Sequence, residues 1–489
     1  MIEIAGGVSA MRVETAVLFA FDDTCLPFRR NLRMHLIHGK SRIHGEPGAE
    51  KTPIVLANGP PGAHDEEAQY YGTTIRIGDE LRMWYMGRIH GNTVAVNYVG
   101  ESGRLCYAVS RDGVEWRKPE LGLVELNGSS RNNIVDLQGG NPGVTAAPVI
   151  HDPDDPDPGR RFKINFESGP YGGRFAVAYS PDGLRWTESP RNPVGPSLEQ
   201  TGLIRFNGCY YVNGQGGGHP GRFRQMLTYA SYDFEHWSEA SVLSLQRSPL
   251  LEGPSLDDRT RTGEEVHLGA ALHERGNVIL GIYGQWHGEP AGDRRYVTMD
   301  LGLLISHDAM HFREPIPGFR FIPAREELDS TIGYGPALMQ GQGMANMGDL
   351  SLYWYALWRH DGQVRLATWE RDRFGYVTPD DPREEARLIS CPVCADNGET
   401  RVFLNVSGLG EYATVRVELL DLEFRPLAGY SGADAALVRE SGLRVPVQWG
   451  SRNALPVTGQ PLRLAVTLGP VGPGCPRPED IRIHALYVN

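Results

Sequence analysis

Residues 107–116 carry the stretch YAVSRDGVEW, and four variants of it follow along the chain. They are AYSPDGLRW (178–186), YASYDFEHW (229–237), LISHDAMHF (304–312) and ATWERDRFGY (367–376). In every copy an Asp precedes an aromatic residue by four positions, and in the first four copies a Ser precedes that Asp by two. The aromatic residues recur at steps of 70, 51, 75 and 64 residues. This spacing indicates an internal repeat of five units.

Each copy is predicted to end one strand in a polar turn and to begin an outer strand at the aromatic residue. The Asp and Ser side chains can accept hydrogen bonds from turn amides, and Gly113 and Gly183 supply backbone angles that other residues rarely adopt. The aromatic side chain would then close the edge between neighbouring units. Two apolar runs precede each copy, such as YYGTTIRI (70–77) and LRMWYMG (81–87) before the first. Four strands in each of five units predict a five-bladed β-propeller.

The chain beyond Pro379 does not continue the repeat. Residues 381–398 are charged and indicate a linker, whereas residues 399–489 alternate apolar and polar side chains between Gly and Pro turns. Such alternation is typical of an antiparallel β-sandwich. Residues 1–60 contain KTPIVLANG (51–59), an expected outer strand that would close the ring. We therefore predict an all-β fold, with a five-bladed β-propeller as catalytic domain at 61–380 and a C-terminal β-sandwich at 399–489.

The composition excludes several classes of protein. Of 489 residues, 40% are hydrophobic and 22% charged, which is too apolar for a disordered chain. The 60 acidic and 48 basic residues give a net charge of −12, which argues against nucleic acid and against an anionic membrane as partners. No apolar stretch is long enough to span a bilayer, and the first residues lack the basic start of a signal peptide. A cytoplasmic location is therefore predicted.

The six cysteines do not form the pattern of a disulfide scaffold. Cys391 and Cys394 form one CPVC motif, but no second pair of ligands follows at the spacing of a structural zinc site, and Cys475 stands alone. We therefore predict neither a metal site nor a cofactor. One exception stays open, because carboxylates gathered in the central channel could supply oxygen ligands to a structural calcium ion.

Candidate catalytic carboxylates stand just before the predicted innermost strands. Alignment of these strands on their small residues gives EEAQYYG (66–72), EQTG (199–202), EEVHLG (264–269) and DSTIGYG (329–335), whereas NPGVTAA (141–147) of the second unit has no acid. A propeller brings the starts of its innermost strands to one mouth of the channel. The candidates are therefore Glu67, Glu199, Glu265 and Asp329. A slip of one residue would replace Glu67 by Glu66 and Glu265 by Glu264.

Clustered carboxylates suit the cleavage of a glycosidic bond. One protonated carboxyl donates to the leaving oxygen, while a second acts as nucleophile or activates water. We assign Glu67 the role of nucleophile or base and Glu265 or Glu199 that of general acid. Asp329 would raise the pKa of the general acid or bind the substrate. The alternative for each residue is an ordinary acidic side chain at an exposed loop end.

Aromatic and histidine side chains near the same mouth are candidates for sugar binding. Trp84, Trp286, Tyr334 and Trp358 lie on or just after predicted inner strands and could stack on a sugar face, although core packing is the alternative for each. His219 and His267 could hydrogen-bond to sugar hydroxyls. The loop GQGGGHPGR (214–222) lacks the Gly-Lys-Ser/Thr ending of a nucleotide-binding loop.

The stretches at 104–135, 149–166 (VIHDPDDPDPGRRFKINF) and 177–189 (VAYSPDGLRWTES) resemble bacterial proteins grouped as family 32-like glycoside hydrolases. The resemblance extends from FDDTCLP (21–27) to the segments RVFLNVSG (401–408) and 415–431, and so covers most of the chain. It implies a five-bladed propeller, a C-terminal sandwich and activity on furanosides such as fructosides or arabinosides. The family's nucleophile motif is absent, but FDDTCLP offers Asp22 and Asp23, of which Asp23 is a candidate for substrate binding.

The leading hypothesis is a glycoside hydrolase that acts on a small furanoside or oligosaccharide. One alternative is a glycoside phosphorylase, in which His219, Arg222 and Arg224 would bind phosphate. Another is a non-catalytic carbohydrate-binding propeller. In all three, the expected partner is a small carbohydrate, and the sequence does not indicate the oligomeric state.

Overall fold

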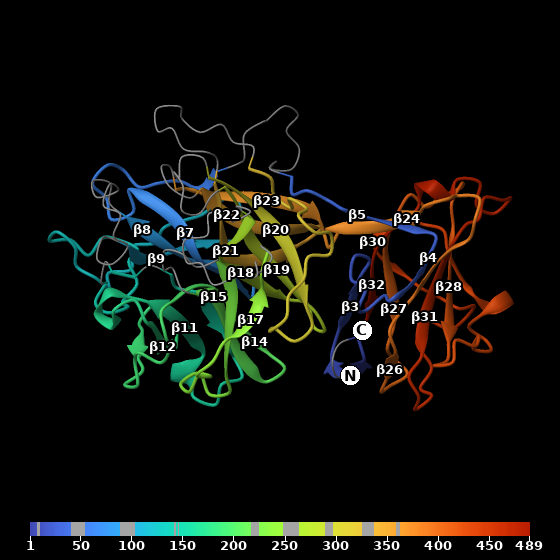
Figure 1. Cartoon of the computed structure of the whole chain (residues 1–489), viewed down its shortest axis with the longest axis horizontal. Helices are drawn as coiled ribbons and strands as arrows, with labels where there is room; N and C mark the ends of the chain where they lie inside the picture. Colours follow the sequence, from blue (N-terminus) through green and yellow to red (C-terminus); the bar gives the residue numbers. More distant parts are fainter. Residues whose placement is uncertain are drawn as a thin grey trace, which may run out of the picture.

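The computed structural model describes residues 1–6, 10–40, 54–88, 103–140, 143–144, 146–216, 224–247, 264–288, 297–324, 337–357 and 362–489. Over these residues the protein is nearly all β, with short 3-10 turns and no α-helix. Figure 1 shows two groups of strands: one runs from blue through green and yellow to light orange, and the other combines orange and red strands with dark blue ones from near residue 1. We call the first the repeat body and the second the terminal body. No helix among the described residues is long and apolar enough to cross a membrane.

The repeat body consists of successive antiparallel sheets, one for each unit of the repeat. The second and third units each form a sheet of four strands and the fourth unit a sheet of three. Their strands are β10 (Val149–His151), β11 (Phe162–Glu167), β12 (Phe175–Ser180) and β13 (Thr187–Glu188); β14 (Leu198–Phe206), β15 (Cys209–Gly216), β16 (Gln225–Ser231) and β17 (Val242–Leu245); and β18 (Glu264–Glu274), β19 (Ile279–His287) and β20 (Thr298–Ser306).

The first and fifth units share one sheet of seven strands in the order β6-β23-β22-β21-β7-β8-β9. A parallel bridge between Gln342 and Thr73 joins β21 to β7. The short N-terminal strand β6 is the outer neighbour of β23, far from it in sequence. The strands are β6 (Ile54–Leu56), β7 (Glu67–Ile77), β8 (Glu80–Arg88), β9 (Arg104–Ser110), β21 (Leu338–Met347), β22 (Leu350–Leu357) and β23 (Val364–Glu370).

The first strands of the five units contact one another in a cycle. Strand β7 contacts β10, β10 contacts β14, β14 contacts β18, β18 contacts β21, and β21 returns to β7. Small residues permit this approach: a Cβ on Gly202 would lie 2.1 Å from the Ala270 carbonyl oxygen, and one on Gly341 would lie 2.1 Å from the Tyr70 ring. First strands such as β21 and second strands such as β19 are buried on both faces, which explains why few charged residues interrupt them.

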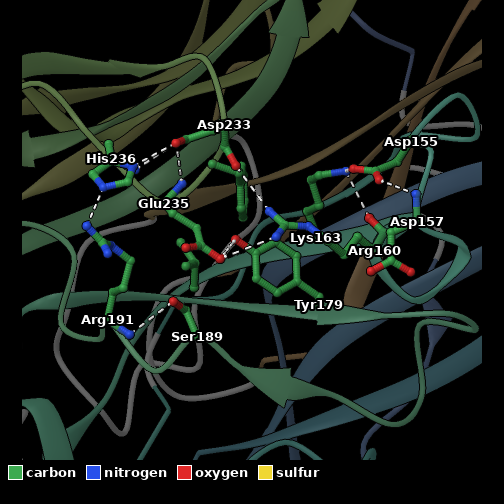
Figure 2. A network of polar contacts seen from close by, with 12 residues as sticks. Asp155, Asp157, Arg160, Lys163, Tyr179, Ser189, Arg191, Asp233, Glu235 and His236 are labelled. Carbon is green, nitrogen blue, oxygen red and sulfur yellow. Dashed lines mark hydrogen bonds and ion pairs between the residues drawn. The ribbon is translucent and has the colours of Figure 1, made fainter.

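The polar turns form as the sequence predicts. Ser110 Oγ accepts a hydrogen bond from Gly113 N at 2.8 Å, and Asp112 Oδ1 accepts from Val114 N and Glu115 N, each at 2.8 Å. The same bonds recur in the next three copies. In the third copy, the turn also contacts the preceding sheet, because Arg160 donates to Glu235 at 3.3 Å and to the Asp233 carbonyl at 3.1 Å (Figure 2).

Tryptophan side chains fasten some of these turns to a neighbouring sheet. Trp84 on β8 donates from Nε1 to the Gly183 carbonyl at 2.7 Å, and Trp354 on β22 donates to the Gly113 carbonyl at 2.9 Å. Gly113 has a φ of +79°, and a Cβ there would lie 2.7 Å from the Trp354 ring. The turn of one unit therefore receives an indole from the unit beside it.

The terminal body combines strands from both ends of the chain. Its two larger sheets have the orders β30-β27-β32-β24-β5, with β3 also paired to β32, and β29-β28-β31-β25-β4; a third sheet is β2-β1-β26. Strands β25 and β26 lie within 381–398, the segment expected as a linker. The N-terminal strands are β1 (Ile2–Ile4), β2 (Met11–Val13), β3 (Ala16–Phe19), β4 (Phe28–Arg30) and β5 (Leu32–Leu36). The remaining strands are β24 (Gly375–Pro379), β25 (Ala386–Ile389), β26 (Val393–Ala395), β27 (Val402–Ser407), β28 (Val415–Leu420), β29 (Ala436–Val438), β30 (Gly442–Pro446), β31 (Arg463–Leu468) and β32 (Arg482–Val488).

The two bodies meet in a buried apolar cluster. Val17, Phe19 and Phe21 pack with Leu280 and Ile282 of β19. Polar contacts join the same surfaces, because Asn277 in the β18–β19 turn accepts a hydrogen bond from Val17 N at 2.7 Å. We call this contact region the seam.

Candidate functional site

Three of the four predicted catalytic carboxylates lie at the starts of first strands in the cycle, and two of these strands, β14 and β18, are adjacent. Glu67 begins β7, Glu199 is the second residue of β14, and Glu265 is the second residue of β18. Because these strands belong to the cycle of first strands, the three residues lie at the same end of it. Asp329 lies outside the described residues, as do His219, Tyr334 and Trp358.

Glu265 is the most enclosed of these carboxylates. Its side chain is 0% exposed, and its Oε2 lies 3.9 Å from Nε of Arg224. The Arg224 guanidinium lies 4.2 Å from the ring centre of Trp286, the residue opposite Glu265 on β19. Arg224 also donates to Gln215 Oε1 at 2.8 Å. The carboxylate is therefore buried beside a cation that the neighbouring sheet orients.

A second set of charges lies next to Glu265 in a chain of ion pairs. Glu264 Oε2 is 2.7 Å from Arg247 Nη2, and Glu264 Oε1 is 2.8 Å from His287 Nδ1. The other ring nitrogen of His287 lies 2.9 Å from Asp300 Oδ2. Arg320 Nε pairs with the same Asp300 oxygen at 3.1 Å. Residues from three adjacent strands and two loops thus form one network.

The network controls the protonation of its central histidine. Burial lowers the pKa of His287, but hydrogen bonds to Asp300 and Glu264 outweigh it and raise that pKa above its usual value. Burial raises the pKa of Asp300. Hydrogen bonds from His287 and from the Ala324 amide lower it by more, so the pKa of Asp300 lies below its usual value. The network therefore favours the protonated form of His287 beside the start of β18.

Glu67 is placed at the same end of the cycle by its position as the first residue of β7. Its side chain is 2% exposed, and Gln69 donates a hydrogen bond to its Oε1. Tyr71, four residues along β7, packs against the apolar cluster that contains Trp286 and Leu268. Tyr71 therefore links the strand that carries Glu67 to an apolar cluster to which the fourth unit contributes Leu268 and Trp286.

Glu199 approaches the site through its partner across the sheet. It stands opposite Gln215, the residue that accepts from Arg224. Gln215 Oε1 also accepts from the Leu268 amide at 3.2 Å, three residues beyond Glu265. One glutamine thus connects the hairpin of Glu199 with the strand of Glu265.

Several predicted sugar-binding residues occupy other places. Trp84 is buried and donates to the turn at Gly183, so its placement matches the core-packing alternative. Trp286 is also buried, with Arg224 over its ring and His267 stacked against it at 5.8 Å between ring centres. Asp23 lies at the seam, where it forms an ion pair with Arg313. We therefore leave Trp84 and Asp23 out of the site.

Sequence reasoning did not identify Arg247, His287 or Asp300. The contacts of His287 with Glu264 and Asp300 depend on the pairing of β18, β19 and β20 in one register. In the sequence, the only signal for these contacts is the distance of each residue from the turns that join β18, β19 and β20. Without the register, a histidine at the end of an apolar strand does not stand out.

A glutamine bridges two of the first strands between this site and their opposite ends. Gln342 on β21 reaches β14, where its amide donates to the Leu203 carbonyl at 2.7 Å and accepts from the Leu203 amide at 2.5 Å. Beyond it lies a cavity of about 250 Å³ lined by residues of β7, β14, β18 and β21, together with His151 and Asp152 at the end of β10. None of the described candidate carboxylates lines this cavity.

Metal-ligating side chains come together at one place among the described residues. Asp22, Cys25 and His307 have donor atoms that all lie within 4.8 Å of one another. They lie at the seam, and His307 follows the end of β20 that is opposite to Thr298 and Asp300. This group is thus separate from the carboxylates at the starts of β7, β14 and β18.

Comparisons with known proteins give matches among solved structures alone. No protein-family model matches the chain, and no curated protein does. A glycosyl hydrolase from Bacteroides ovatus is 14% identical, with 69% of this chain and 98% of that chain covered and a TM-score of 0.43. A β-1,2-mannobiose phosphorylase from Listeria innocua, in complex with β-1,2-mannobiose, is 12% identical, with 65% and 94% covered and a TM-score of 0.41. The function proposed below therefore rests on the side chains of this chain.

Proposed function

We propose that this protein cleaves glycosidic bonds at the mouth formed by the starts of β7, β14 and β18. The observation that carries the proposal is the Glu265 carboxylate, which is fully buried, lies 3.9 Å from Arg224 and stands at the same end of the ring as Glu67 and Glu199. A buried carboxylate is costly unless it is paired or has a function. Two or more carboxylates at one opening are the minimum that acid-assisted glycoside cleavage requires.

The proposal includes a five-bladed propeller for residues 61–380, closed by the N-terminal segment, and a C-terminal sandwich at 399–489. Two features support this arrangement. The five first strands contact one another in a cycle, and each of the five contributes to the lining of a single cavity. The pairing of β6 with β23 supports closure of the ring by a strand from the other end of the chain.

The proposed roles follow from the charges next to each carboxylate. Arg224 lies beside Glu265 and balances its charge, which suits the nucleophile or the base. Glu67 would then act as the general acid, with Glu199 as the alternative. This reverses the roles that the sequence alone favours for Glu67 and Glu265. Small carbohydrates, with furanosides first, are the proposed substrates, and the cytoplasm is the proposed location.

A substrate panel with matched variants tests the proposal. The purified protein would be assayed on aryl furanosides, aryl pyranosides and small fructans in phosphate-free buffer. We expect turnover of one class, and a fall in kcat/KM of about 10³-fold or more in Glu265→Gln and Glu67→Gln. Glu411→Gln, on an exposed turn of the terminal body, is the control and should keep full activity.

Two outcomes would contradict the proposal. Full activity in both Glu265→Gln and Glu67→Gln would remove these residues from the chemistry. No turnover on any substrate, combined with a sugar-induced rise in the melting temperature, would favour the carbohydrate-binding alternative. Circular dichroism of each variant would show whether a lost activity reflects a lost fold.

A glycoside phosphorylase is the second candidate, and one observation favours it. Arg224 and Arg247 both lie beside the Glu264–Glu265 pair, and His287 adds a third cationic group. Cations arranged in this way suit a phosphate that replaces water as the attacking group. Turnover that requires inorganic phosphate and falls in Arg224→Met would establish this candidate, whereas phosphate-independent turnover would exclude it.

A further inference from the structure

The seam contains a cluster of side chains that the proposed reaction does not use. The loop FDDTCLP (21–27) follows β3 and carries Asp22 and Cys25, both 0% exposed. His307 reaches the same point from the turn after β20, and Cys391 reaches it from the segment between β25 and β26. Three segments that are remote in sequence therefore meet in a buried polar site.

The donor atoms lie at distances that one small ion could span. The ligating atoms of Asp22, Cys25 and His307 all lie within 4.8 Å of one another. His307 Nε2 is 3.0 Å from Asp22 Oδ2 and 3.2 Å from Asp22 Oδ1, so imidazole and carboxylate face each other in a buried place. This facing pair needs a positive charge between its two atoms, and a bound cation can supply it.

Cys391 places a second thiol beside the first. Its backbone amide donates to the Cys25 carbonyl at 2.8 Å, which holds the two residues side by side. A Cβ on Gly6 would lie 2.8 Å from the Cys25 sulfur and 3.2 Å from the Cys391 sulfur, so both sulfurs face the same backbone. The two cysteines are not joined in a disulfide.

Neighbouring groups orient the donors as they do around bound metals. His307 Nδ1 lies 3.1 Å from the Asn277 carbonyl oxygen, to which it can donate, so Nε2, which faces Asp22, is the ring nitrogen that would bind the ion in place of its proton. The Thr24 amide donates to Asp22 Oδ1 at 3.0 Å, and Asn277 Nδ2 donates to the Cys25 sulfur at 3.3 Å. The rotamers of three ligands are therefore set by partners outside the cluster.

We propose that Asp22, Cys25 and His307 bind a zinc ion that joins the repeat body to the terminal body, and that Cys391, whose sulfur lies outside the 4.8 Å group but beside Cys25, moves in as the fourth ligand. Nitrogen, sulfur and carboxylate oxygen are the ligands that zinc takes in four-coordinate sites, and a closed, buried set of four is typical of a structural ion. Binding releases the two thiol protons to solvent, and the ion with one carboxylate and two thiolates carries a charge of −1. The Arg313 guanidinium, 3.4 Å from Asp22 Oδ1, offsets that charge.

Metal analysis and cobalt substitution of the full chain test the proposal. Protein purified without chelator should contain about one zinc per chain by mass spectrometry. Co²⁺ added to the metal-free protein should give thiolate-to-cobalt charge-transfer absorption in the near ultraviolet, and Zn²⁺ should displace it. This readout needs no variant and is independent of any glycosidase activity.

Variants then assign the ligands. Cys25→Ser and Cys391→Ser should weaken or abolish the cobalt absorption, and zinc should raise the melting temperature of the original chain but not of these variants. Cys394→Ser is the matched control from the same CPVC motif, because Cys394 is half-exposed on β26 and should leave the absorption unchanged. No absorption in the original chain, or absorption that survives in both Cys25→Ser and Cys391→Ser, would overturn the proposal.

Discussion

Asp372, the aspartate of the fifth repeat copy, provides the sharpest test of how the sheets are held together. Instead of bonding within its own turn, its buried carboxylate pairs with both terminal nitrogens of Arg275 from the β18–β19 turn. It also accepts from Asn346 at 3.1 Å and from Tyr487 of β32 at 2.8 Å. One side chain therefore joins the fourth unit, the fifth unit and the terminal body.

The expected cost of Asp372→Asn follows from that burial. The side chains of Asp372 and Arg275 are 1% and 13% exposed, so loss of the carboxylate leaves a guanidinium that water barely reaches. Removal of one partner from a buried ion pair costs about 3–5 kcal/mol. Asp112→Asn is the matched control, because Asp112 occupies the same repeat position on the surface and an Asn there can still accept the turn hydrogen bonds. We expect that control to cost about 0.5 kcal/mol or less.

Guanidinium unfolding followed by tryptophan fluorescence measures both effects. Burial raises the pKa of Asp372, but Arg275 outweighs it and the net direction is down. A lowered folded-state pKa gives stability that is complete above the unfolded value of about 3.9 and is lost as the pH falls through the folded-state value. The gap between the original chain and Asp372→Asn should therefore shrink in acid. Equal costs for Asp372→Asn and Asp112→Asn at pH 7 would refute this reasoning.

Three further substitutions probe other contacts. Trp354→Phe keeps an aromatic ring but removes one of the two indole donors to the Gly113 carbonyl, while Trp116 still donates at 3.0 Å, so it should cost about 1 kcal/mol in denaturant unfolding. Gln342→Leu deprives both backbone groups of Leu203 of their partner and should cost about 2 kcal/mol or more by the same assay. The raised pKa of His287 gives stability that is complete below the unfolded value of about 6.5 and is lost as the pH rises through the folded-state value. Melting temperatures of the original chain and His287→Gln between pH 5.5 and 9 should therefore converge with rising pH, and parallel curves would contradict this.

The local features of the repeat could be predicted from the sequence, because they depend on residues close to one another. The Ser and Asp side chains of the turns bond to amides within three positions, as at Ser110 and Asp112. The apolar runs before each turn form strands, and they are apolar because both of their faces pack against neighbouring sheets. Asp372 matches the same pattern but has a different role, since its partner Arg275 is 97 positions away.

The partners of the N-terminal strands could not be predicted in the same way. Strand β3 pairs with β32, and β5 pairs with β24, although nothing in a run such as AVLF indicates which edge will receive it. The site shows the same limit. The sequence could place Glu67, Glu199 and Glu265 at or next to the starts of strands, whereas the contacts of Arg247, His287 and Asp300 depend on register and loop positions. Tryptophans are equally ambiguous, because a ring that can stack on a sugar can also fill a core.

The pairing of β3 with β32 has a consequence for the order of events during synthesis. Strand β3 (Ala16–Phe19) is translated well before its partner β32 (Arg482–Val488), beside which it lies in the folded protein (Figure 1). The sheets of the repeat body contain contacts that become available unit by unit, whereas the edge of β3 that pairs with β32 stays open until residues 482–488 have been made. A nascent chain that stalls before residue 482 therefore exposes that edge of Ala16–Phe19 to aggregation or to chaperones.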